Sequence, residues 1–231
     1  MESDPKEFWD KKILSWEVGR YGTPAKRVGI VEWIANRSSM SLRFRIRVVP
    51  QLLEPHLHNR RVVEIGCGSG LLARPLLDRG AASYVGIDIA EAAIARARER
   101  SENIDPRIEF VCGGVDQAMS RPGDIVISLG LFDWLNESEI EELFQRSGDA
   151  DVLHAIAERR PGFQQSLHRL YLRLTYGHDA NAYRPRYFLP TQIVALAAKA
   201  ATRPLHIYRD RRLSFGALIS TFPIGPTIEP N

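Results

Sequence analysis

The sequence predicts an α/β fold with a mainly parallel sheet, and three observations carry this prediction. Short apolar runs rich in β-branched residues alternate with helix-forming stretches from residue 61 onward. A glycine-rich turn at Gly66, Gly68 and Gly70 directly follows the first of these runs, residues 62–65. The last two apolar runs are separated by only a short polar stretch, which is typical of an antiparallel pair.

Seven strands are expected from these apolar runs. They cover residues 62–65, 84–87, 108–112, 124–129, 151–157, 205–209 and 215–221. Helices are expected at residues 71–79, 91–100 and 191–200, and in a segment that ends near Phe144 and begins with a capping box of Ser138 and Glu141. Because parallel neighbours need right-handed crossovers, the helices should cover both faces of the sheet.

The first 59 residues lack this alternation and predict a helical extension. The expected domains are therefore 1–59 and 60–231. Helices are expected at residues 8–16, 25–37 and 41–57. The aromatic first helix would either fold over a bound ligand and exclude water, or pack on the core. The arginines of the third helix are interpreted as a solvated face, with contact to a phosphate or an acidic substrate as the alternative.

Composition limits the class of protein. The chain has 231 residues and a formal net charge of +3, which is too mild for the concentrated basic face of a nucleic-acid-binding protein. The two cysteines, Cys67 and Cys112, show no metal-binding spacing, and reduced thiols are expected. The N-terminus lacks an apolar signal core, and no apolar run is long enough to span a bilayer. We therefore expect a soluble, cytoplasmic protein that is a monomer or a homodimer.

The glycine turn has two acidic neighbours that suit a ligand. Glu64 lies in the first expected strand, two residues before Gly66. Asp88 lies at the end of the second expected strand, eighteen residues after Gly70. An ionised carboxylate at that offset can accept hydrogen bonds from both hydroxyl groups of a ribose. A glycine spacing alone is a weak signal, because nicotinamide-binding folds use a similar turn.

The pattern Glu64-x-Gly66-x-Gly68-x-Gly70, with a following strand that ends in Gly-x-Asp88, resembles the class I S-adenosylmethionine-dependent methyltransferases. The resemblance covers roughly residues 60–222 and implies a Rossmann-like fold with S-adenosylmethionine as cofactor. A nicotinamide oxidoreductase is disfavoured by Glu64 and by the glycine spacing.

The resemblance implies a set of cofactor-binding residues at the ends of four strands. In that family the glycine loop passes under the methionine and ribose, and the fourth strand borders both cofactor and acceptor. The residues are Glu64, Gly66, Cys67, Gly68, Gly70, Asp88, Ile89, Gly114, Val115, Ser128, Leu129 and Gly130. The backbone of Gly114 and Val115 would meet the adenine, whereas Asp116 comes late in the chain for that contact.

Acceptor and catalytic residues are expected in and around an insertion at residues 159–190. Its candidates for substrate binding are Tyr176, Tyr183, Arg184 and Arg186, and the two arginines suit an anionic acceptor. The candidates for a general base are His154, His178 and Asp133. Each histidine could instead be a structural hydrogen-bonding group, and Asp133 could be a helix or turn cap. No metal is expected, because these three residues do not form a convincing ligand set.

The expected function is methyl transfer to a small-molecule or glycan acceptor, most naturally at oxygen. A faint similarity of the N-terminal segment to stand-alone bacterial methyltransferases points to surface-polysaccharide or natural-product biosynthesis. The alternatives are a non-catalytic methyltransferase-like binding module, or a methyltransferase that acts on a porphyrin or quinone, a peptide or a nucleic acid. The nucleic-acid alternative is disfavoured, because the segment after the fourth strand is not of the Asn-Pro-Pro-Tyr type.

Overall fold

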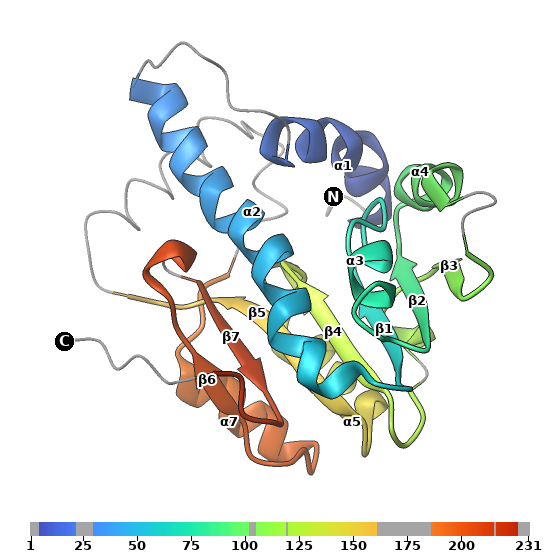
Figure 1. Cartoon of the computed structure of the whole chain (residues 1–231). Coiled ribbons are helices and arrows are strands. Elements are labelled where there is room, and N and C mark those ends of the chain that lie inside the picture. The colour runs from blue at the N-terminus through green and yellow to red at the C-terminus, as the bar shows by residue number, and fades with distance from the viewer. Residues whose placement is uncertain are drawn as a thin grey trace.

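The structure is a computed structural model, and it describes residues 5–21, 30–101, 105–118, 120–160, 186–214 and 216–225. One seven-stranded sheet runs through the molecule in the order β3-β2-β1-β4-β5-β7-β6 (Figure 1). The strands are β1 (Arg61–Ile65), β2 (Ser83–Asp88), β3 (Ile108–Cys112), β4 (Ile125–Leu129), β5 (Asp151–Ala157), β6 (His206–Tyr208) and β7 (Gly216–Ser220).

Five strands of this sheet, β1 to β5, run parallel, and β7 pairs antiparallel with both β5 and β6. The prediction of a mainly parallel sheet with a closing antiparallel hairpin is therefore confirmed. Strand order reverses between β1 and β4, because the chain first winds outward to β3 and then returns to the other side of β1. Ligands of open α/β sheets bind beyond the carboxyl ends of the strands at such a reversal.

Helices cover both faces of the sheet (Figure 1). The helices are α1 (Pro5–Tyr21), α2 (Ile30–Leu57), α3 (Ala73–Leu77), α4 (Glu91–Ser101), α5 (Glu137–Ser147) and α7 (Pro190–Lys199). Buried residues of α2, α3 and α4 share one apolar core with the sheet, and those of α5 and α7 share the other. The central parallel strands β1, β4 and β5 are thus largely buried on both faces, which explains their nearly continuous apolar composition, whereas the edge strand β3 is partly exposed.

Two expectations about helices were wrong. Residues 30–57 form one helix, α2, where we expected separate helices at 25–37 and 41–57. No glycine or proline lies in the intervening residues 38–40, so nothing there ends the hydrogen-bond ladder. Helix α3 is also shorter than expected, because the glycine turn extends beyond Gly70 as successive turns.

The capping box of α5 also differs from the prediction. Asn136, rather than Ser138, is the N-cap: its side chain accepts a hydrogen bond from the amide of Glu139 (3.0 Å). The Glu139 carboxylate accepts one in return from the amide of Asn136 (2.7 Å). The predicted pair of Ser138 and Glu141 was wrong by two residues, because a serine in the first turn mimics the same motif in sequence.

Helix α1 lies across the carboxyl ends of the strands and contacts both sides of the reversal in strand order (Figure 1). On one side Ile13 packs on Ala90 and Ala93 of the β2–α4 region. On the other side the ring of Trp9 meets that of Trp134, after β4, with centroids 4.9 Å apart. Within the described part of the chain, no helix is long and apolar enough to cross a membrane.

Candidate active site

The glycine turn after β1 is tied to the end of β2. The amides of Gly66 and Cys67 both donate to the carbonyl of Ile87, at 2.8 and 3.1 Å. Gly66, Gly68 and Gly70 all have positive φ angles, of 72°, 53° and 71°. Residues other than glycine rarely adopt this left-handed backbone conformation, so the turn depends on its glycines.

The three glycines face different neighbours. A Cβ atom at Gly66 would lie 3.4 Å from Leu131, and one at Gly70 would lie 2.5 Å from the ring of Phe110. At Gly68 it would overlap a carboxylate oxygen, Oε1 of Glu17 on α1. Gly70 therefore allows close packing of Phe110, Gly68 allows α1 to approach the turn, and Gly66 leaves room for an ordinary contact.

Asp88 is held by two backbone amides at the carboxyl end of β2. Its Oδ2 accepts a hydrogen bond from Gly68 (2.8 Å), and its Oδ1 accepts one from Ala90 (2.9 Å). Burial raises the pKa of this carboxyl, the two amides lower it, and the negative charges of Glu17 and Asp10 raise it. The side chain keeps partial exposure, so its carboxylate is rigidly placed and still accessible to a ligand.

Glu64 lies beneath the turn, on β1, and is 3% exposed. Its Oε2 accepts a hydrogen bond from the hydroxyl group of Tyr84 on the neighbouring strand. Burial raises the pKa of Glu64 to about 8, against the smaller opposing effect of the Tyr84 hydrogen bond. The carboxyl group therefore carries a proton at neutral pH in the structure as it stands.

Two other residues of the expected cofactor set, Cys67 and Ser128, have buried side chains. The Cys67 side chain is buried in the apolar core, and burial raises the pKa of its thiol. Ser128 is fully buried and its hydroxyl group pairs with His154. Gly130 ends β4 with a φ of 101°, and a Cβ atom at Gly114 would lie 3.7 Å from Ile89.

Asp133 follows β4 in a short 3-10 turn, Phe132–Trp134. Its Oδ1 accepts a hydrogen bond from the amide of Ala157 at the end of β5 (3.0 Å). Its backbone carbonyl accepts one from the amide of Arg186 (2.7 Å). Burial raises the pKa of Asp133 to about 6, and the positive charge of Arg45 on α2 opposes that rise. This carboxyl can exchange a proton near neutral pH.

His154 has a different environment. The side chain is fully buried on β5, and its Nδ1 lies 2.9 Å from the hydroxyl oxygen of Ser128. Its ring makes a tilted contact with Phe132 and an edge-on contact with Phe144. Burial lowers its pKa to about 3, so the imidazole stays neutral. Its Nε2 has no hydrogen-bond partner within the described part of the chain. This position favours a packing role over general-base catalysis.

The insertion is described only at its two ends. His178, Tyr176, Tyr183 and Arg184 lie outside the described residues. Arg186 is exposed, and the segment that it begins returns alongside β5, where Phe188 exchanges backbone hydrogen bonds with Ala157 and Arg159 (2.9 and 2.8 Å). The end of the insertion therefore lies beside Asp133.

Sequence reasoning missed two residues of the site. Glu17 reaches the glycine turn, where its Oε1 accepts a hydrogen bond from the amide of Ser69 (2.9 Å). Arg45, interpreted as part of a solvated face, acts on Asp133 and has a buried Nε without a hydrogen-bond partner among the described residues. The alternation of arginines in α2 was the only sequence signal for Arg45, and nothing in the sequence singled out Glu17.

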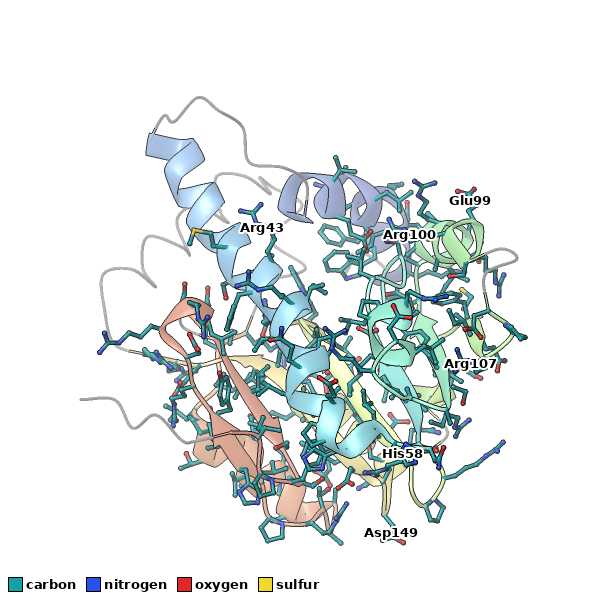
Figure 2. All side chains as sticks on the ribbon, viewed as in Figure 1. Arg43, His58, Glu99, Arg100, Arg107 and Asp149 are labelled. Atoms are coloured by element: carbon teal, nitrogen blue, oxygen red, sulfur yellow. The ribbon has the colours of Figure 1, made fainter. Side chains whose placement is uncertain are left out.

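Arg100 on α4 completes the support of the turn. Its Nη1 donates to the hydroxyl oxygen of Ser69 (2.9 Å) and to its carbonyl (3.2 Å), and Figure 2 labels this residue. The described residues contain no group of three His, Cys, Asp or Glu side chains arranged to hold a metal ion. The arrangement is a glycine turn with convergent carboxylates on one side of the reversal, and a titratable carboxyl on the other.

Comparison with protein families gives a match over this part of the chain. Residues 62–150, which run from β1 to the residue before β5, match the model of the methyltransferase domain. They include the glycine turn, Asp88 and Asp133. This segment is thus similar to a methyltransferase domain. The resemblance identified from Glu64, the three glycines and Asp88 is therefore confirmed.

Two curated relatives are similar to part of this chain. Malonyl-[acyl-carrier protein] O-methyltransferase of Acetivibrio thermocellus is 37% identical over 78 residues, which are 33% of this chain and 27% of that protein. Ribosomal protein L11 methyltransferase of Klebsiella pneumoniae is 36% identical over 74 residues, 31% of this chain and 25% of that protein. The matches thus span about a quarter of the length of these relatives.

Solved structures share the fold over most of the chain. Magnesium protoporphyrin IX methyltransferase from Synechocystis PCC 6803, with bound S-adenosylhomocysteine, has a TM-score of 0.69 and 16% identity, and the match covers 93% of this chain and 96% of that one. Human N-acetylserotonin methyltransferase, in complex with S-adenosylmethionine, has a TM-score of 0.59 and 14% identity over 93% of this chain and 65% of that one. These likenesses establish the Rossmann-like methyltransferase fold.

Proposed function

We propose that this chain transfers a methyl group from S-adenosylmethionine to a small-molecule or glycan acceptor, at an oxygen atom. The observation that carries the proposal is the donor half of the site. There, a left-handed glycine turn and the amide-held carboxylate of Asp88 lie at the reversal of strand order within a methyltransferase domain.

The residues present fit the cofactor. Asp88 is accessible, and its carboxylate oxygens can accept hydrogen bonds from two ribose hydroxyl donors. Burial keeps the carboxyl of Glu64 protonated, and a positively charged ligand nearby would favour its ionised form. When bound, the cofactor supplies an activated methyl group on a sulfonium with a good leaving group. The chain then contributes mainly orientation and exclusion of water.

Asp133 supports the acceptor half of the proposal. With its pKa raised to about 6, the carboxyl is ionised at neutral pH and is still a stronger base than an ordinary aspartate. It can therefore accept a hydroxyl proton from the acceptor during transfer. The nearby charge of Arg45 keeps the pKa from rising further, so the basic form remains populated near neutral pH. His178 remains an alternative base that lies outside the described residues.

The relatives' names indicate different acceptors: an acyl-carrier-protein conjugate, a ribosomal protein, a porphyrin and N-acetylserotonin. Similarity therefore does not select the acceptor. We propose a hydroxyl-bearing glycan or natural-product intermediate, because Asp133 is a base and the arginines of the insertion suit an acidic partner. A cytoplasmic monomer or homodimer is the corresponding form of the enzyme.

A transfer assay with isotope-labelled S-adenosylmethionine and fractionated metabolite extracts tests the proposal. Label should enter a low-molecular-weight product and remain stable to base if an ether is formed. Asp88→Ala should abolish most incorporation at low cofactor concentration, whereas Asp149→Asn, at an exposed and distant position (Figure 2), should not. Tight cofactor binding without transfer to any fraction would instead support a non-catalytic binding module.

A further inference from the structure

Helix α1 is fixed over the donor site by contacts along much of its length. Near its start, Lys6 pairs with Glu91 at the beginning of α4. One turn later, Asp10 accepts a hydrogen bond from the amide of Ala92 (3.2 Å). Ile13 then packs on Ala90 and Ala93. These contacts set the register of the helix and direct the next turn, with Glu17, toward the glycine turn.

Glu17 is an unusual residue for this position. The side chain is 9% exposed, and its Oε1 would overlap a Cβ atom at Gly68. The same oxygen accepts a hydrogen bond from the amide of Ser69 (2.9 Å). Among the described residues, no basic side chain forms an ion pair with it. A buried carboxylate with one amide partner is only partly compensated for the loss of its hydration.

Three carboxyl groups converge on the same turn. The amide of Gly68 donates to Asp88, and the next amide, that of Ser69, donates to Glu17. Glu64 lies beneath them, and the charges of both Asp88 and Glu17 raise its pKa. The negative charges of Asp88 and Glu17 repel each other, so a cation bound beside the turn would stabilise the arrangement.

The cofactor and its product differ in charge at this place. S-adenosylmethionine has a sulfonium, an ammonium and a carboxylate group, and the product S-adenosylhomocysteine lacks the sulfonium charge. A site with an excess of negative charge therefore favours the cofactor over its product. A carboxylate held at the turn from a separate helix would add to that preference without taking part in the transfer itself.

We infer that Glu17 is a donor-site residue whose charge makes the site prefer S-adenosylmethionine to S-adenosylhomocysteine. The inference rests on the proposed function, because it concerns the same donor site. Its consequence is product release: once the methyl group leaves, the attraction between the site and the ligand weakens, and the spent cofactor dissociates more readily.

Glu17→Gln isolates the charge. The amide oxygen of glutamine can still accept the hydrogen bond from Ser69, so the support of the turn is kept. Dissociation constants for both ligands are measured by calorimetry on the full chain. We expect binding of S-adenosylmethionine to weaken about tenfold, equivalent to about 1.4 kcal/mol, and binding of S-adenosylhomocysteine to weaken clearly less. The ratio of the two constants is the readout.

Glu7→Gln is the matched control. Glu7 lies on the same helix, is exposed and pairs with Lys11, so its replacement should leave both constants unchanged. Glu17→Asp provides a second variant that keeps the charge and shortens the reach to Ser69. It should retain the preference for S-adenosylmethionine even if both ligands bind more weakly.

The outcomes separate the two proposals. A wild-type chain that binds neither ligand overturns the proposed function. A wild-type chain that binds both, with an unchanged ratio in Glu17→Gln, overturns only the role of Glu17. An equal loss of affinity for both ligands also overturns that role, because Glu17 would then only support the conformation of the turn. If Glu17→Gln does not fold, a lost preference in Glu17→Asp overturns it as well.

Discussion

Replacing the buried Glu64 by glutamine should stabilise the ligand-free protein, and the gain should grow with pH. The glutamine oxygen can still accept the hydrogen bond from Tyr84. What the substitution removes is a proton-binding group whose folded-state pKa is raised from 4.5 to about 8.

The sign follows from proton linkage. Below about pH 4.5 both the folded and the unfolded chain hold the proton, so Glu64 has no pH-dependent effect. As the pH rises, the unfolded chain releases this proton while the folded chain keeps it. Each pH unit in that window therefore costs the wild type about 1.4 kcal/mol of unfolding free energy. Between about pH 5.5 and 7.5 the wild type should lose about 2–3 kcal/mol of unfolding free energy through this group. The Glu64→Gln variant should not show this loss.

Urea unfolding at these two pH values measures the effect. The quantity of interest is the difference in unfolding free energy between variant and wild type, because other titrating groups cancel in it. Glu137→Gln, at an exposed position on α5, is the control and should show no pH-dependent difference. If the gain of Glu64→Gln is the same at both pH values, Glu64 is ionised in the folded chain and our account of this carboxyl group is wrong.

Further substitutions test the rest of the site. Asp88→Ala should weaken cofactor binding by about 1.5–3 kcal/mol, measured by calorimetry, and an unchanged affinity would refute the ribose assignment. Asp133→Asn should lower kcat about 100-fold or more, and the wild-type rate should fall as the pH drops through about 6; a flat pH profile would exclude this base. Gly68→Ala should weaken cofactor binding at least tenfold, because a left-handed alanine meets the Glu17 carboxylate, and normal affinity would show that α1 moves aside freely. His154→Phe should leave kcat within about threefold, since the imidazole is buried among aromatic rings, and a larger loss at saturating cofactor would restore it as a catalytic group.

The fold could be predicted because its signals are local. Each strand is a short, largely apolar run, and each predicted strand is present within one or two residues of its expected bounds. The errors occurred where local signals compete. Ser38 and Ser39 do not end α2, and Ser138 resembles an N-cap although Asn136 holds that position. Boundaries depend on which of several possible hydrogen bonds forms, and composition does not decide that.

The donor site was predictable only in part. The glycines and Asp88 lie in contiguous motifs whose spacing has a physical reason. Glu17 and Arg45 reach the site from helices far away in sequence, and only the packing of α1 and α2 brings them there. His154 shows the opposite case: a residue type suited to catalysis lies in the core because β5 directs that side chain toward Phe132 and Phe144. The division of the chain at residue 60 stays a prediction.

Calorimetric titration of the full chain with S-adenosylmethionine, S-adenosylhomocysteine and NAD tests the central claim most directly. The convergent carboxylates, the glycine turn and the accessible Asp88 predict binding of the first two in the micromolar range, with the cofactor tighter than its product, and no binding of NAD. Tight binding of NAD, or no binding of either sulfur ligand, would contradict the account.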